Sequence, residues 1–221
     1  MKQVLVALTA AATLAGCGGR KAAPQGARPA PAVAGARMPV APPLDWRTVA
    51  TLADRDRLRK WRSALLEALE RARAGGSGPA IAAQGALLVP DARLADPLPP
   101  PGQYRCRVFK LGAKSAGMLD YIAYPPFTCR IDRDGALLRF EKISGSQRPV
   151  GRIFPDAGGR PVFLGTLMLG DETRAMAYGR DEDRDMAGFV DRVGEARWRL
   201  VLPLPAFESL VDVIELVPAT S

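Results

Sequence analysis

Four acidic side chains in the second half of the chain are of the type that cleaves glycosidic bonds: Asp171, Glu172, Asp185 and Glu208. That reaction needs two carboxyl groups flanking the bond, one of them acting as a general acid, and it needs no histidine. The chain contains no histidine, which excludes Ser-His-Asp and Cys-His catalysis and histidine-ligated zinc. Because the sequence does not place two of these carboxylates in one cleft, we assign no catalytic residue. A histidine-free glycan hydrolase is kept as an alternative.

Nucleotide and metal sites find no support in the sequence. Neither a GxGxxG nor a GxxxxGK[ST] loop is present, so no nucleotide cofactor is expected. The stretch from Asp181 to Asp185 begins like a calcium loop, with carboxylates at its first, third and fifth positions. However, Met186 replaces the glycine of the sixth position and Arg192 the glutamate of the twelfth. We therefore predict no metal site and no cofactor.

A polar loop between two predicted strands is the candidate ligand site. It runs from Ser144 to Pro149 and offers four polar side chains, Ser144, Ser146, Gln147 and Arg148. Small polar residues beside an arginine could hold an anionic or glycan ligand at a barrel mouth. A hydrogen-bonded turn explains the same residues more simply.

The N-terminus carries a lipidation motif. An apolar run from Val4 to Ala15 follows Lys2, is too short to span a bilayer, and has the pattern of a secretory signal. Its end, Leu14-Ala15-Gly16-Cys17, resembles the lipobox of bacterial lipoproteins, in which the cysteine receives a thioether-linked diacylglycerol. The resemblance, with Gly18 next, implies anchoring of Cys17 in the outer membrane, on the periplasmic face. Export excludes nucleic acid as a partner despite the net charge of +8.

Two further cysteines, Cys106 and Cys129, fall on the apolar faces of predicted strands. In an oxidising periplasm two such cysteines usually pair. Closing a loop of this length stabilises the fold by roughly 3 kcal/mol in the chain-entropy model. A catalytic thiol would need an activating base, and no histidine supplies one. We predict a structural disulfide.

Composition divides the chain into four segments. Residues 1–16 are the signal peptide, and 17–45 are the lipidated cysteine with a tether rich in Pro, Ala and Gly, whose prolines block regular structure. Residues 46–102 are a helix and a connector with one helical turn, and 103–221 are a β-domain. We expect 46–221 to form one folding unit.

The helix is predicted from Trp46 to Ala74, because its apolar residues recur at steps of three and four. They are Leu58, Trp61, Leu65, Leu69 and Ala72. Asp54 is the expected N-cap, and Gly75-Gly76 is the expected end.

Beyond residue 103 the pattern changes to short runs with two-residue alternation, separated by turn residues. The predicted strands are 104–108, 127–132, 136–143, 149–154, 161–169, 173–178, 187–193, 197–202 and 210–217. The last segment also fits a helix, but its Val and Ile residues favour a strand. Eight or nine strands after one helix predict a mainly β (α+β) protein, a small antiparallel β-barrel or sandwich with a lipocalin-like or streptavidin-like outline.

The chain from about Trp46 to Pro218 resembles the bacterial domain-of-unknown-function 4893 family, a family of uncharacterised exported proteins. The resemblance rests on five motifs: Tyr104-Arg105-Cys106-Arg107, Gly145-Ser146-Gln147-Arg148-Pro149, Phe163-Leu164-Gly165-Thr166-Leu167, Arg197-Trp198-Arg199-Leu200-Val201 and Asp212-Val213-Ile214-Glu215-Leu216. It implies an exported single domain and adds no catalytic or binding residue.

Together these observations predict a non-enzymatic lipoprotein that binds an envelope protein or glycan through its loops or barrel mouth. A lipocalin-like carrier of a small apolar ligand is the first alternative, and the glycan hydrolase is the second. The barrel interior separates the first two readings. A hollow interior favours the carrier, whereas an interior filled by aromatic rings favours a protein-binding or inhibitor module; the rings in question are Phe127, Phe140, Phe163 and Trp198.

Overall fold

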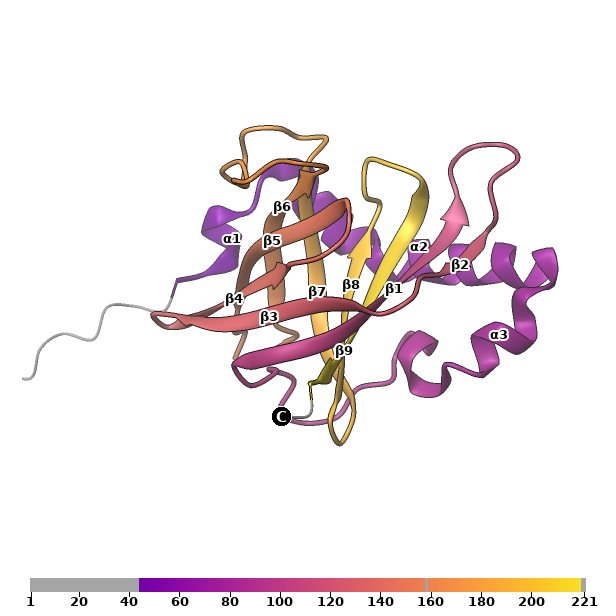
Figure 1. Cartoon of the computed structure of the whole chain (residues 1–221), viewed down its shortest axis with the longest axis horizontal. Helices are drawn as coiled ribbons and strands as arrows, with labels where there is room; N and C mark the ends of the chain where they lie inside the picture. Colours follow the sequence, from indigo (N-terminus) through magenta and orange to yellow (C-terminus); the bar gives the residue numbers. More distant parts are fainter. Residues whose placement is uncertain (1–43, 158, 220–221) are drawn as a thin grey trace, which may run out of the picture. The chain divides into compact units, whose positions relative to one another are not determined.

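The computed structural model describes residues 44–157 and 159–219 (Figure 1). The signal peptide, Cys17 and the tether up to residue 43 lie outside the described residues. The helical elements are α1 (Trp46–Val49), α2 (Leu52–Ala72), η1 (Arg73–Ser77), α3 (Gly78–Ala82) and η2 (Gly85–Leu88). The strands are β1 (Gly102–Ala113), β2 (Tyr121–Ala123), β3 (Phe127–Asp134), β4 (Leu137–Lys142), β5 (Gln147–Phe154), β6 (Val162–Leu169), β7 (Asp185–Gly194), β8 (Arg197–Pro203) and β9 (Ser209–Pro218).

The strands form a closed antiparallel barrel. The sheet order is β2-β1-β3-β4-β5-β6-β7-β8-β9, and β1 pairs with β9 as well, so β1 and β3 to β9 make an eight-stranded ring. β1 pairs with β9 along nearly its whole length, from Tyr104 to Ala113. Its opposite side pairs first with β3, as far as Cys106, and then with β2, from Phe109 to Leu111. The predicted mainly β fold with an N-terminal helix is therefore confirmed, and it is a barrel.

Helix α2 packs on the outer face of the barrel, against β1, β7, β8 and β9. Its apolar stripe is buried as the spacing predicted, with Leu65 and Leu69 fully enclosed. The predicted N-cap was wrong: the helical run breaks after α1, and Thr51 caps α2 by accepting the backbone N–H of Asp54 at 3.1 Å. The Asp54 carboxylate is instead buried, where it accepts hydrogen bonds from Tyr178 Oη and Arg57.

The connector between α2 and β1 is held to the barrel by one buried arginine. Arg199 on β8 projects outward, and its guanidinium donates hydrogen bonds to the backbone carbonyls of Leu87, Val89 and Pro90, each at 2.8 Å. The same guanidinium pairs at 2.9 Å with Asp191, its cross-strand partner on β7. Arg199 thus adds a charged donor to carbonyls at the end of the connector's short helical turns, where backbone partners are few.

Aromatic rings fill the interior of the barrel away from its open end. Phe140 and Phe163 meet edge to face with their centroids 5.8 Å apart, and Tyr104 and Trp198 do so at 6.4 Å. The strands leave room for these rings through glycines, since a Cβ on Gly165 would lie 2.5 Å from Phe163 Cζ. Aromatic pairs of this geometry add stability beyond their buried area.

The predicted disulfide is present in the interior. Cys106 on β1 and Cys129 on β3 are bonded, with their Cα atoms 5.9 Å apart. Both residues are fully buried and face inward, as the alternation of their strands predicted. The bond joins the two strands where β1 turns from β3 towards β2.

Two details of the strand prediction were wrong. The segment 173–178 is a loop between β6 and β7, although its alternation resembles a strand. Tyr178 explains why: its hydroxyl donates to the buried carboxylate of Asp54 and accepts the N–H of Thr51, so the loop is bound to α2 rather than to a sheet. Conversely, the three residues of β2 form a strand that the sequence did not indicate. The last predicted strand is present as β9.

Candidate functional site

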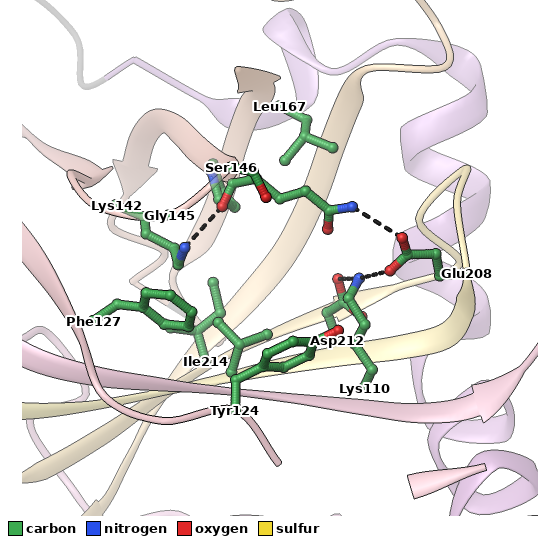
Figure 2. Close-up of a pocket in the computed structure, with 13 residues that line it drawn as sticks. Lys110, Tyr124, Phe127, Lys142, Gly145, Ser146, Leu167, Glu208, Asp212 and Ile214 are labelled. Carbon is green, nitrogen blue, oxygen red and sulfur yellow. Dashed lines mark hydrogen bonds and ion pairs between the residues drawn. The ribbon is translucent and has the colours of Figure 1, made fainter. Parts of the chain in front are cut away.

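A cavity of about 310 Å³ opens at one end of the barrel, and we call it the mouth cavity (Figure 2). Its apolar lining comes from paired strands: Val108 faces Ile214 across β1 and β9, and Pro149 faces Leu167 across β5 and β6. The volume is at the lower end of the roughly 300–1,000 Å³ range of small-molecule sites. The cavity therefore suits a small ligand, or one end of a larger one.

The aromatic wall comes from the turn between β2 and β3 and from the first residue of β3. Tyr124 and Phe127 line the cavity, with ring centroids 6.4 Å apart. Phe127 is thus a wall of the mouth cavity, whereas Phe140, Phe163 and Trp198 belong to the packed interior. Three of the four rings expected in the interior therefore fill it, whereas the fourth, Phe127, borders the open space of the cavity.

Lys110, Glu208 and Asp212 form a charged cluster on one side of the cavity. Lys110 and Asp212 are cross-strand partners on β1 and β9, and Lys110 Nζ lies 3.2 Å from Asp212 Oδ2 and 3.0 Å from Glu208 Oε2. Glu208 also accepts a hydrogen bond from Gln147 Nε2 at 3.1 Å. Its backbone takes a left-handed conformation, with φ of 65°, which is uncommon for a residue with a side chain.

Burial acts on the pKa values of the two buried members of this cluster, Asp212 and Lys110. Burial raises the pKa of the Asp212 carboxyl, and the Lys110 ammonium and the Ser209 hydroxyl only partly offset it. For Lys110, burial acts to lower the pKa, but the Asp212 and Glu208 carboxylates outweigh it and the pKa is raised. The charged form of Lys110 is therefore favoured by the two acidic side chains beside it.

Lys142 lies apart from that cluster, beside Phe127 (Figure 2). As the cross-strand partner of Cys129 it faces the barrel interior, and only 3% of its surface is exposed. Its ammonium donates to the backbone carbonyls of Ser144 at 2.7 Å and Gln147 at 2.9 Å, and lies 3.7 Å from the Phe127 ring centroid. Cation–π contact of this kind is favourable.

Within the described residues, no carboxylate pairs with Lys142. Burial is the main cause that lowers its pKa to about 8, and the positive charges of Arg148 and Lys110 add to the effect. Gly145 leaves room for the ammonium because it has no side chain. It has a φ of 88°, and a Cβ at this position would lie 2.7 Å from Lys142 Nζ. The loop is therefore shaped around a buried cation.

Two of the four residues of the predicted ligand loop face the cavity, and the other two do not. Ser146 and Gln147 line the mouth cavity. Ser144 Oγ instead accepts the N–H of Thr128 at 2.9 Å, and the Arg148 guanidinium donates to loop carbonyls, including that of Gly170 at 2.8 Å. Ser144 and Arg148 therefore hold the loop in place, and the other two face the cavity.

Sequence reasoning missed the three buried charges of the cavity, Lys110, Lys142 and Asp212. A signal was present for two of them. Lys110 continues the inward series that includes Cys106, and Lys142 stands two residues after the inward Phe140. Strict alternation on a strand therefore predicts that both lysines point into the barrel.

Three of the four carboxylates considered for glycan hydrolysis have partners among the described residues. Glu208 belongs to the mouth cavity, but it shares Lys110 with Asp212. Glu172 pairs with Arg184 at 2.5 Å, and Asp185 accepts the N–H of Gly179 at 2.9 Å. Asp171 is exposed.

The described residues offer neither a cluster of metal ligands nor a membrane-spanning helix. They contain no group of three His, Cys, Asp or Glu side chains suited to holding a metal ion. They also contain no helix with the length and apolar character that a bilayer span requires. The acidic stretch considered as a calcium loop is a turn, in which Asp181 Oδ1 accepts the N–H of Asp183 at 3.1 Å.

Comparison with known proteins gives a family and no relative of known activity. No curated protein and no solved structure matches the chain. A family model described as "Domain of unknown function (DUF4893)" matches residues 46–216, which cover most of the chain and the whole barrel as far as Leu216 on β9. The chain therefore belongs to the DUF4893 family of domains of unknown function.

Proposed function

We propose that this chain is a non-enzymatic binding module of the bacterial envelope that takes a small amphipathic component, or one end of a larger one, into the mouth cavity. One observation carries the proposal: at the open end of an otherwise filled barrel, an apolar floor lies beside buried charged side chains. Ligand sites commonly combine apolar walls with a few placed polar groups.

The same geometry gives less support to the alternatives. A carrier that encloses an apolar ligand deep in the barrel would need the space that Tyr104, Phe140, Phe163 and Trp198 occupy. A glycan hydrolase would need two carboxyl groups free to act on the bond, but Glu208 and Asp212 are bound to one ammonium.

Photocrosslinking in cells tests the binding proposal. A photoreactive phenylalanine analogue replaces Tyr124 in the wall of the mouth cavity, and Leu94, which is half exposed on the connector, serves as the control position. We expect an envelope component to be crosslinked from position 124 and not from 94. Identical adducts from both positions, or none from 124, would contradict the proposal.

We further propose that acylation of Cys17 holds the module on the periplasmic face of the outer membrane. The support is the lipobox Leu14-Ala15-Gly16-Cys17 at the end of the apolar run. Several acyl chains make such anchoring effectively permanent. Radiolabelled palmitate should enter the wild-type chain and not Cys17→Ser, and the label should fractionate with the outer membrane. Failure of the wild type to incorporate palmitate would overturn the anchoring.

A further inference from the structure

The two buried lysines of the mouth cavity differ in how their charges are met. Lys110 has two carboxylates within 3.2 Å of its ammonium. Lys142 has two backbone carbonyls and an aromatic ring. A buried charge that meets only dipoles is less well stabilised than one with a counter-charge. An incoming anion would therefore stabilise the charge of Lys142 more than that of Lys110, which already has two carboxylate partners.

The remaining charged groups around Lys142 reinforce this difference. Arg148, on β5, and Lys110, on β1, are the charges that act on its ammonium, and both are positive. The acidic side chains of the cavity, Glu208 and Asp212, are both engaged by Lys110 on the other side. A negative group that enters beside Lys142 thus meets attraction there, while the two carboxylates oppose its moving across the cavity.

Uncommitted hydrogen-bond donors lie along the same cavity. Two of the three N–H groups of Lys142 are used by carbonyls. The side-chain hydroxyls of Ser146 and Tyr124 line the cavity and have no hydrogen-bond partner within the described part of the chain. The two oxygens of a carboxylate need few donors, whereas a phosphate presents three strong acceptor oxygens. This small donor set suits a carboxylate.

From these contacts we infer that the ligand is a carboxylate-bearing amphiphile, whose anionic group pairs with Lys142 and whose apolar part lies on Val108, Leu167 and Ile214. The inference rests on the proposed binding function and names its ligand class. Pairing adds a counter-charge to a buried ammonium without displacing an existing partner.

Calorimetry with matched probes tests the inference. The acylated full-length mature protein is reconstituted in phosphatidylcholine nanodiscs, and empty nanodiscs correct for partitioning. The probes are 4-phenylbutyrate, the neutral 4-phenylbutanol and the cationic 4-phenylbutylamine, which share one apolar group. We expect the carboxylate to bind at least ten-fold more tightly than the alcohol at pH 7, and the amine to bind most weakly.

Substitutions and pH dependence test whether the Lys142 ammonium causes the preference for the carboxylate. Lys142→Met should reduce carboxylate binding to the level of the alcohol, whereas Lys60→Met, on the exposed face of α2, should leave it unchanged. Near-UV circular dichroism checks that each variant is folded. For the wild type alone, the preference for the carboxylate should fall as pH rises through about 8, because the Lys142 ammonium then loses its proton.

The outcomes separate this inference from the proposed function. Equal binding of acid and alcohol, or a preference that survives in folded Lys142→Met or at pH 9.5, overturns the carboxylate inference and leaves binding at the mouth cavity standing. Binding of no probe at millimolar concentration also overturns it. Crosslinking from position 124 decides the proposed function separately.

Discussion

Replacement of Arg199 by methionine removes the side chain that fastens the connector to the outer face of the barrel. Methionine keeps an apolar stem but ends where the guanidinium begins, and it donates no hydrogen bond. The Arg199 side chain is 1% exposed, so water cannot take its place without local opening. The carbonyls of Leu87, Val89 and Pro90 would lose their charged donor.

The size of the effect follows from what the substitution leaves behind. Removal of one partner of a buried ion pair destabilises a protein by about 3–5 kcal/mol. The Asp191 carboxylate keeps Arg160, whose Nε lies 2.7 Å from its Oδ1, so it is not left as an uncompensated charge. The full 3–5 kcal/mol applies where the remaining charge is uncompensated, so here the loss comes from the bond to Asp191 and the three bonds to carbonyls, at roughly 1 kcal/mol each. We expect Arg199→Met to lower the free energy of unfolding by about 4 kcal/mol.

Urea denaturation followed by circular dichroism measures this loss as a lower midpoint at an unchanged slope. Arg199→Lys, which keeps the charge but has three donors instead of five, should lose about half as much. Arg105→Met, an exposed arginine on β1, is the matched control and should change stability by less than about 0.5 kcal/mol. A loss below about 1 kcal/mol for Arg199→Met would refute the reasoning, as would faster amide exchange spread evenly over the barrel rather than centred on the connector.

Three further predictions concern the barrel and its mouth. Replacing both Cys106 and Cys129 by alanine should lower stability by about 3 kcal/mol in urea, because their sequence separation is 23; an unchanged midpoint would contradict this. The pKa of Lys142 is lowered to about 8 in the folded protein, so above that pH the unfolded chain holds this proton more tightly than the folded one. Between pH 7 and 9.5 the free energy of unfolding of the wild type should therefore rise by about 2 kcal/mol relative to that of Lys142→Met. Parallel pH profiles of stability for the two proteins would argue against a buried ammonium. Gly165→Ala places a Cβ 2.4 Å from the Val150 carbonyl oxygen and should lower the thermal midpoint, with a loss of about 3 kcal/mol; a midpoint equal to that of the wild type would show that the strands can relax.

The barrel was predictable because two-residue alternation is a local property. Each strand shows which of its side chains turn inward, and this placed Cys106 and Cys129 on one buried face before their pairing was known. The loop at 173–178 was misread because its alternation is genuine. What decides its structure is the bond from Tyr178 to Asp54, 124 positions away in the sequence.

The candidate site was predictable only at its loop. Alternation indicates that Lys110 and Lys142 face inward. The role of an inward lysine, however, depends on which groups its ammonium contacts, and alternation does not give these. Lys110 meets Asp212 through the closure of β1 on β9, across 102 positions of sequence. Lys142 is defined by the carbonyls it binds and by the carboxylates it lacks among the described residues, and neither has a sequence signature.

Barrel closure also bears on how copies of the chain behave when crowded together. In the described sheet order the terminal strand is β2, which is three residues long, while β9 is covered by β1. Aggregation by strand addition requires a long free edge as a template. Acylation at Cys17 would concentrate neighbouring chains in the plane of a membrane. Even there, the short β2 edge would offer few unpaired backbone groups for the strand pairing that builds fibrils.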